Sequence, residues 1–218
     1  IETAVRRLKD ENATGPSKMR AEDIKAWLKL SKPAIRETDP EPDPVQWNAL
    51  CELVSHIFQT QEIPKELAWQ YLALLPEADG GVRGIGLLEI VWKLVEAIID
   101  NRITSSVQLH EMIHGFRAGR GTGTAIIEVK LQQELASTLH LPLYRVFVDL
   151  AKAFDTFDRE RTLEILFDYG MGERLVNLLR NYWAIQVLVA KQGGFFGPAF
   201  PAGRGGAQGG LITPKVFN

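Results

Sequence analysis

The chain has 218 residues, of which 45% are hydrophobic and 24% charged, and these values are ordinary for a globular protein of one large domain or two small lobes. Its formal net charge of −2 gives no bulk electrostatic argument for nucleic-acid binding. Cys51 is the only cysteine, which excludes a disulfide framework and a structural zinc site built on cysteines.

Apolar periodicity and turn residues divide the first half of the chain into helices and one hairpin. Apolar side chains three and four residues apart indicate helices, and two apolar runs that flank Asp79-Gly80-Gly81 indicate a β-hairpin. In chain order, we predict a helix over 20–31, an acidic Pro-rich linker over 33–44, a helix over about 47–58, strands over 69–75 and 82–85, and a helix over 87–103.

The second half alternates helices with two predicted strands. The strand over 144–150 is predicted from its β-branched and aromatic residues, and it ends in a carboxylate. Asp158 suits a helix N-cap and Gly170 the matching stop. The full order is a Gly/Arg loop over 115–123, a helix over 124–139, that strand, helices over 158–170 and 173–183, a strand over 186–191, and a turn-rich segment over 193–210 with eight of the 19 glycines. The predicted class is α+β, because the strands are too scattered for a βαβ repeat.

Charge is distributed unevenly along the chain. Five basic residues and no acidic one follow Glu173, whereas the linker carries four acidic residues against Arg36 alone. A basic C-terminal segment suits a phosphate-binding surface and equally suits a solvated face. No apolar run reaches the ~20 residues that span a bilayer, and the amphipathic start with Arg6, Arg7 and Lys9 does not resemble a signal peptide. We therefore expect no membrane partner.

Two segments of the second half offer residues with chemical potential. Asp149 ends a predicted strand, where a carboxylate can hold a metal ion against a phosphate, although a plain strand terminus would look the same. The glycine cluster over 203–210 surrounds Gln208; it allows close backbone approach to a flat partner and offers an amide to a base or sugar. A flexible turn between a strand and a helix would have the same composition.

Together, four segments resemble the motifs of reverse transcriptases in order and spacing, over about residues 65–218. Residues 147–155, FVDLAKAFD, resemble the first palm motif of non-LTR retrotransposon and group II intron enzymes. Residues 206–218, GAQGGLITPKVFN, resemble the glycine-rich motif that comes next. Residues 114–122, HGFRAGRGT, and the region from Val82 to Arg102 resemble the two fingers motifs.

The resemblance implies an α+β fold of right-hand polymerase fingers and partial palm, helix-rich with a small antiparallel sheet. It would comprise a helical N-terminal segment (1–64), fingers (65–143) and a partial palm (144–218). The parent enzyme would copy an RNA template from a DNA primer with dNTPs and two Mg²⁺ ions. The implied roles are catalysis and metal binding for Asp149, metal binding for the Leu150 carbonyl, nucleotide contacts for Arg83, Phe154, Gln208 and Gly209, and nucleic-acid contacts for Arg117, Arg120 and Lys152. Phe154 would exclude a ribose 2′-hydroxyl, and Arg83 would clamp the triphosphate.

The sequence also departs from the family pattern. Pro76 precedes Glu77, where the fingers motif usually has lysine, and Gly84 follows Arg83, where proline is usual. The motif with an aromatic residue, any residue and two aspartates does not occur before Asn218, so we expect an incomplete metal site and no polymerisation by these residues alone. The alternative is a catalytically degenerate RNA-binding remnant of the fold. The long N-terminal segment and the form of the palm motif favour a retrotransposon parent.

One motif points to a different chemistry. His110-Glu111-Met112-Ile113-His114 matches the zinc-hydrolase pattern H-E-x-x-H, whose histidines bind zinc from one face of a helix. Gly115 breaks the helix directly after the second histidine, and His114 already belongs to a fingers motif. A zinc hydrolase therefore remains the remote alternative.

Overall fold

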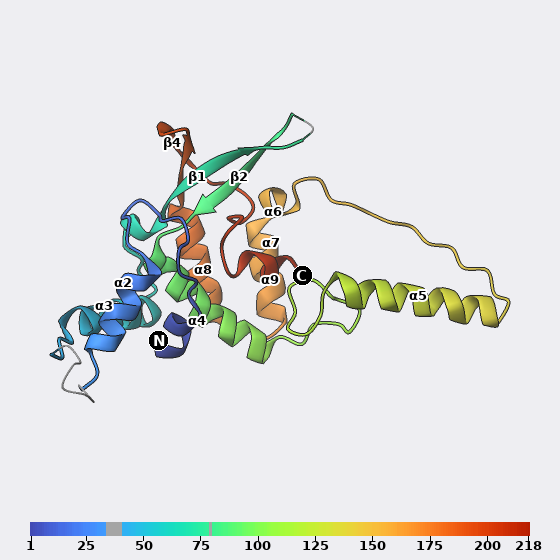
Figure 1. The fold of residues 1–218 in the computed structure, drawn as a ribbon, viewed down its shortest axis with the longest axis horizontal. Helices are drawn as coiled ribbons and strands as arrows, with labels where there is room; N and C mark the ends of the chain where they lie inside the picture. Colours follow the sequence, from blue (N-terminus) through green and yellow to red (C-terminus); the bar gives the residue numbers. More distant parts are fainter. Residues whose placement is uncertain (34–40, 79) are drawn as a thin grey trace.

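A small sheet and a group of helices form the body of the molecule, and one long helix projects from it (Figure 1). The computed structural model describes residues 1–33, 41–78 and 80–218. The elements up to α4 are α1 (Glu2–Arg7), α2 (Ala21–Leu30), α3 (Val45–Thr60), the 3-10 turn η1 (Lys65–Ala68), β1 (Trp69–Pro76), β2 (Val82–Leu87) and α4 (Ile90–Ser106). They are followed by α5 (Thr122–Thr138), α6 (Ala153–Thr156), α7 (Arg159–Asp168), α8 (Glu173–Ile185), β3 (Val187–Gln192), β4 (Phe195–Pro201) and α9 (Thr213–Phe217).

The predicted α+β class is confirmed, and most predicted elements are present within a few residues of their expected bounds. Most of the predicted acidic linker and the predicted turn residue Asp79 lie outside the described residues. Four elements were not predicted, namely the short helices α1 and α6, the turn η1, and the strand β4, which occupies part of the expected turn-rich segment. None of the helices in the described residues is long and apolar enough to span a bilayer.

The sheet is mixed, with the strand order β2-β1-β3-β4. β1 pairs antiparallel with β2 and β3 pairs antiparallel with β4, but β1 and β3 are parallel, with Trp69 opposite Val187. The prediction of an antiparallel sheet is therefore wrong for this central pair. Parallel strands need a long crossover, and here the chain from β2 to α8 supplies it. The register brings Gln70 and Leu72 to the same sheet face as Gly86 and Leu188.

Helix α4 forms the centre of the hydrophobic core. Ten of its residues are buried, including two charged ones, because other elements surround the helix. The Trp92 indole stacks on the Tyr182 ring of α8, with centroids 3.5 Å apart and planes 8° from parallel. The Tyr182 hydroxyl in turn accepts a hydrogen bond from Gln70 Nε2 at 3.1 Å. The helix, the sheet and α8 are thereby joined through one buried contact chain.

The strand predicted over 144–150 is wrong. The structure has irregular extended backbone there, with Tyr144, Phe147 and Val148 at least 80% exposed. A strand needs a neighbour to satisfy its backbone groups, and β1–β4 pair only with one another. The segment instead returns from the far end of α5, a helix without buried residues, toward α6 as a long exposed arm that projects from the body together with α5 (Figure 1). The β-branched and aromatic composition of this segment therefore does not lead to strand formation, because no strand of the described residues pairs with it.

The core assignment predicts a sharp contrast between two leucines in long helices. Replacing Leu94, which is fully buried in α4, by alanine should lower the free energy of unfolding by about 2–5 kcal/mol, because it removes buried methyl groups and leaves a cavity. The same change at Leu135, which is 60% exposed in α5, should cost less than ~0.5 kcal/mol. Urea denaturation of both variants measures this, and equal losses would contradict the core described above.

Candidate active site

The glycine loop, defined as residues 203–210, runs between the palm-motif segment and strand β2. The Gly205 amide donates to the Phe157 carbonyl at 2.9 Å, and the Gly206 amide donates to the Phe154 carbonyl at 2.8 Å. Further along the loop, the Gln208 carbonyl accepts the Gly86 amide of β2 at 2.7 Å. Backbone hydrogen bonds therefore join three segments that are far apart in the sequence.

Two glycines make this close passage possible. Gly205 has φ +66°, and a Cβ there would lie 2.5 Å from backbone atoms of Phe154 and Asp155. Gly209 has φ +120°, and its Cβ would lie 2.7 Å from the Gly86 carbonyl oxygen. Only glycine adopts such backbone at little cost and leaves room for a neighbouring chain. The composition of the loop is thus required by its packing.

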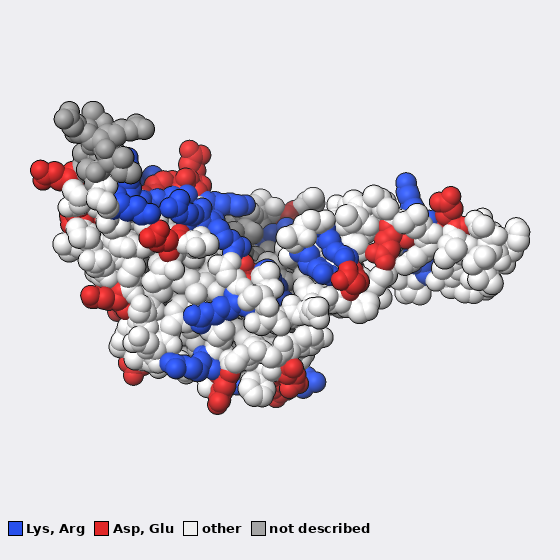
Figure 2. Space-filling view, turned by 90° about the horizontal axis from the view of Figure 1, so that it is seen from below, with Lys and Arg blue, Asp and Glu red and all other residues white. Residues whose placement is uncertain are grey.

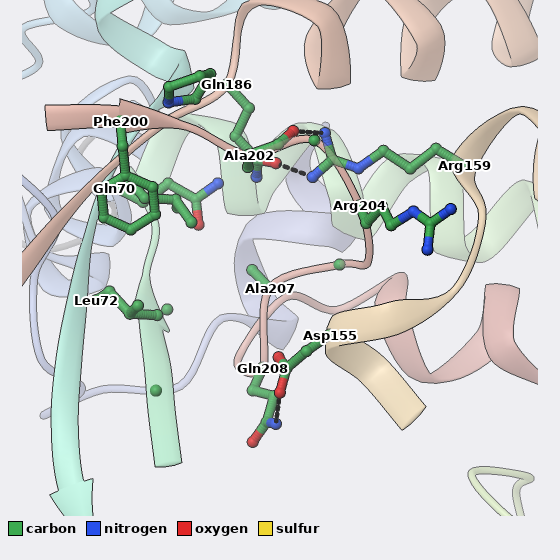
Figure 3. Close-up of a pocket in the computed structure, with 16 residues that line it drawn as sticks. Gln70, Leu72, Asp155, Arg159, Gln186, Phe200, Ala202, Arg204, Ala207 and Gln208 are labelled. Carbon is green, nitrogen blue, oxygen red and sulfur yellow. Dashed lines mark hydrogen bonds between the residues drawn. The ribbon is translucent and has the colours of Figure 1, made fainter. Parts of the chain in front are cut away.

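A cavity of about 320 Å³ lies between the loop and one face of the sheet (Figure 3). Gln70 and Phe200 lie at one end and Asp155 and Gln208 at the other, where Gln208 Nε2 donates to Asp155 Oδ2 at 3.4 Å. Gln70 is fully buried, and its Oε1 has no hydrogen-bond partner in the described residues. The cavity therefore combines apolar walls with a few amide and carboxylate groups.

Arg159 closes the cavity from the side of α7 and was missed by the sequence analysis. Its buried guanidinium donates to the carbonyls of Gly205 at 2.8 Å, Trp183 at 2.9 Å and Ala202 at 2.5 Å, and to Gln186 Oε1. Burial lowers the pKa of this group to about 10. Arg159 remains charged at neutral pH and fixes the start of the glycine loop. Nothing in its sequence neighbourhood distinguishes it from a solvated helical arginine.

Three aromatic rings from three motifs meet beside the loop. The Phe154 ring lies 5.4 Å from Phe217 and 6.1 Å from Phe116, both in edge-to-face geometry. Such pairs are favourable because the positive edge of one ring meets the negative face of the other. The cluster brings the palm motif, the glycine-rich motif and a fingers motif together around Phe154, the predicted sugar gate.

Asp149 and Leu150, the predicted metal ligands, lie on the exposed arm. The described residues include no group of three or more His, Cys, Asp or Glu side chains that could hold a metal ion. A lone carboxylate with the Leu150 carbonyl supplies too few oxygen ligands for Mg²⁺, which takes six in an octahedron. The described residues thus do not fit a complete magnesium site, and no chemical step is derived through one.

Of the four basic residues predicted to contact nucleotide or nucleic acid, three already bind other groups of this chain. Arg83 Nε lies 2.8 Å from Glu77 Oε1. The glutamate that stands where the fingers motif usually has lysine therefore pairs with the arginine predicted to clamp the triphosphate. Arg117 donates to the His110 carbonyl at 2.7 Å, and Arg120 binds Glu111. These two arginines hold the loop between α4 and α5. Lys152, in contrast, is the N-cap of α6 with φ +51°, and it is exposed.

Most basic residues of the C-terminal segment interact with other residues of the chain. Arg174 binds the Phe58 and Gln59 carbonyls, Arg180 pairs with Glu160, Lys191 lies over the Tyr71 and Phe196 rings, and Lys215 pairs with Asp100. Figure 2 shows Lys and Arg gathered on the body and few of them on the α5 arm. Around one hollow of the N-terminal helices lie Arg6, Lys25, Leu28, Lys29 and Lys32.

The H-E-x-x-H residues do not form the geometry of a zinc site. Residues 107–121 are turns and loop, so His110 and His114 share no helix face. His114 Nδ1 lies 2.8 Å from Thr124 Oγ1, and its Nε2 lies 2.6 Å from Glu128 Oε2. Both nitrogens of this ring are therefore occupied by α5, and the ring anchors the start of that helix.

The glycine loop joins the β1–β2 hairpin to the segment around Phe154, which carry two of the motifs recognised in the sequence. The family model described as "Reverse transcriptase (RNA-dependent DNA polymerase)" matches residues 75–218. The chain belongs to the reverse transcriptase family, and the resemblance recognised in its sequence is confirmed. No curated protein matches the sequence. The narrower likeness to non-LTR and group II intron enzymes stays a prediction.

The packing of the glycine loop predicts different outcomes for two glycines. Gly205→Ala should destabilise the protein by about 1–3 kcal/mol, because alanine at positive φ is strained and its methyl group meets backbone. Gly203→Ala should be nearly neutral, since nothing lies within 4 Å of its Cβ position and its φ is not positive. Trypsin cleavage after Arg204 should accelerate in the first variant alone. Equal cleavage rates would show that the loop is not held as described.

Proposed function

We propose that the chain supplies the fingers and part of the palm of an RNA-directed DNA polymerase. The reaction is transfer of a nucleotide from a dNTP to a primer 3′-hydroxyl on an RNA template, by in-line attack. The single observation that carries the proposal is the pair of backbone contacts by which Gly206 meets Phe154 and Gln208 meets Gly86. These contacts support the proposal because they hold Gln208 beside β2 and the preceding part of the loop beside Phe154. The division at residues 64 and 143 into N-terminal segment, fingers and palm belongs to the same proposal.

Each predicted residue has one role in this proposal. Arg83 binds the triphosphate, Gln208 and Gly209 contact the nucleotide and the template, and Phe154 excludes the ribose 2′-hydroxyl. Arg117, Arg120 and Lys152 lie along the nucleic-acid path. The reverse transcriptase family uses Mg²⁺, which neutralises phosphate charge during the transfer. Asp149 and the Leu150 carbonyl are the described groups that would contribute to binding it.

A second candidate function is an RNA-binding remnant without polymerase activity. One observation favours it, namely the Glu77 carboxylate that pairs with Arg83. Primer extension on an RNA template by the full-length protein separates the two candidates. Incorporation of dNTP that is lost in Asp149→Asn supports the polymerase. Binding of RNA that weakens steeply with salt, without incorporation, supports the remnant.

The ion pair between Arg83 and Glu77 predicts opposite effects of two substitutions on dNTP binding. Arg83→Ala should weaken binding about tenfold, because a charge-assisted contact to phosphate is lost. Glu77→Gln should strengthen it by up to about fivefold, because an exposed ion pair that competes with the phosphate is removed. Fluorescence titration with a labelled dNTP measures both. Unchanged affinity in Arg83→Ala would refute the clamp assignment.

The gate assignment of Phe154 is tested by sugar discrimination in the full-length enzyme. Phe154→Ala should raise ribonucleotide incorporation relative to deoxynucleotide incorporation at least severalfold, because the ring no longer fills the space of a 2′-hydroxyl. Phe116→Ala is the matched control, since it removes the same ring contact within the aromatic cluster. An equal effect of both variants would mean that loosened packing, and not a gate, sets the selectivity.

A further inference from the structure

A buried carboxyl group of α4 holds the backbone that directly follows the glycine loop. Glu96 Oε2 accepts the Leu211 amide at 2.6 Å, and Oε1 accepts the Trp92 indole Nε1–H at 3.1 Å. The residue is 3% exposed. A Cβ at position 210 would lie 3.2 Å from Glu96 Oε2, so the loop passes directly over the carboxyl group. Leu211 is two residues from Gly209, whose predecessor Gln208 hydrogen-bonds to β2.

Few charged groups face this carboxyl group. Lys93 on the same helix and the Tyr182 hydroxyl of α8 interact with it electrostatically. Asp100, one turn further along α4, is paired with Arg7 at 3.0 Å and with Lys215 at 2.8 Å. Burial raises the pKa of Glu96 to about 7, against the opposing effects of the Leu211 and Ile212 amides, the Trp92 indole and Lys93.

We propose that Glu96 is a positioning residue of the glycine loop, whose protonation state determines how firmly Gln208 and Gly209 are held against β2. The inference rests on the proposed function only in so far as those two residues contact nucleotide and template. The anchoring itself depends on the hydrogen bond to Leu211 and on the cover that the loop provides.

The direction of the pH effect follows from proton linkage. The loop residues 210–212 cover the carboxyl group, so opening of the loop lets water reach it and returns its pKa toward 4.5. The closed loop therefore binds the proton more tightly than the open loop does. Its stabilisation is complete below about pH 4.5 and is lost as the pH rises through about 7. Between pH 6 and pH 8 the ratio of closed to open loop should fall by up to about tenfold.

Hydrogen exchange of the Leu211 amide, followed by NMR on the chain from pH 6 to pH 8, tests this. After correction for the intrinsic exchange rate, protection should fall by up to about tenfold from pH 6 to pH 8 and level off above about pH 7. In Glu96→Gln, whose amide does not titrate, protection should be independent of pH. Glu89→Gln is the matched control, because this buried carboxylate of the same region binds the Ser17 amide at 2.7 Å instead of the glycine loop. It should keep the wild-type profile.

Two further readouts keep the proposal falsifiable. A carbon-detected titration of Glu96 in the wild-type chain must give a pKa that matches the pH above which Leu211 protection levels off, even where Glu96→Gln fails to fold. A pH-independent wild-type profile, a mismatch between these two pH values, or a profile unchanged in Glu96→Gln would overturn the proposal. The affinity for an RNA–DNA hybrid should follow the same pH profile in the wild type and lose it in Glu96→Gln. If the chain binds no hybrid while the exchange profile is as expected, the proposed function is refuted, but the proposed role of Glu96 in positioning the glycine loop is not.

Discussion

The close passage of the glycine loop past two backbones is the constraint on which the rest of the site depends. The loop reaches Phe154 on one side and Gly86 on the other through backbone hydrogen bonds of 2.7–2.8 Å. Those distances exist because Gly205 and Gly209 have no Cβ. Because main-chain atoms make these hydrogen bonds, the loop is held without using the side chain of Gln208. The same loop therefore serves as a structural joint and as part of a candidate binding surface.

Two buried polar residues hold this loop, Arg159 near its start and Glu96 directly after it. Arg159 satisfies three carbonyl groups and one side-chain amide, so it acts as a capping group for irregular backbone that no helix or strand could satisfy. Glu96 does the complementary work for amide groups, since a carboxyl group accepts where a guanidinium donates. A basic and an acidic side chain on different helices thus hold the two ends of the glycine loop. Each residue is buried at a cost that its hydrogen bonds offset.

The sequence predicted the structural features that depend on residues close together in the chain, and it failed for those that depend on distant partners. The buried face of α4 and the N-cap of α7 were readable, because periodicity and capping act within a few residues. The segment over 144–150 was misread, because strand formation depends on a partner that local composition does not reveal. β4 was missed for the opposite reason: its residues are exposed and interrupted by glycine and proline, yet β3 pairs with them. The motifs predicted which residues belong together, and Glu96 lies within the fingers motif that ends at Arg102. Arg159 lies outside the motifs, and only the packing identifies it and the contact of Glu96 with Leu211.

The parallel pairing of β1 with β3 has a consequence for biosynthesis. The β1–β2 hairpin and α4 are close in sequence and can assemble as soon as they leave the ribosome, because local contacts form quickly. The other edge of β1 pairs with residues 187–192, which emerge only after the whole arm has been translated. Until then an apolar strand edge is available to other nascent chains. Protection of this edge until β3 has been translated therefore favours the native pairing over aggregation.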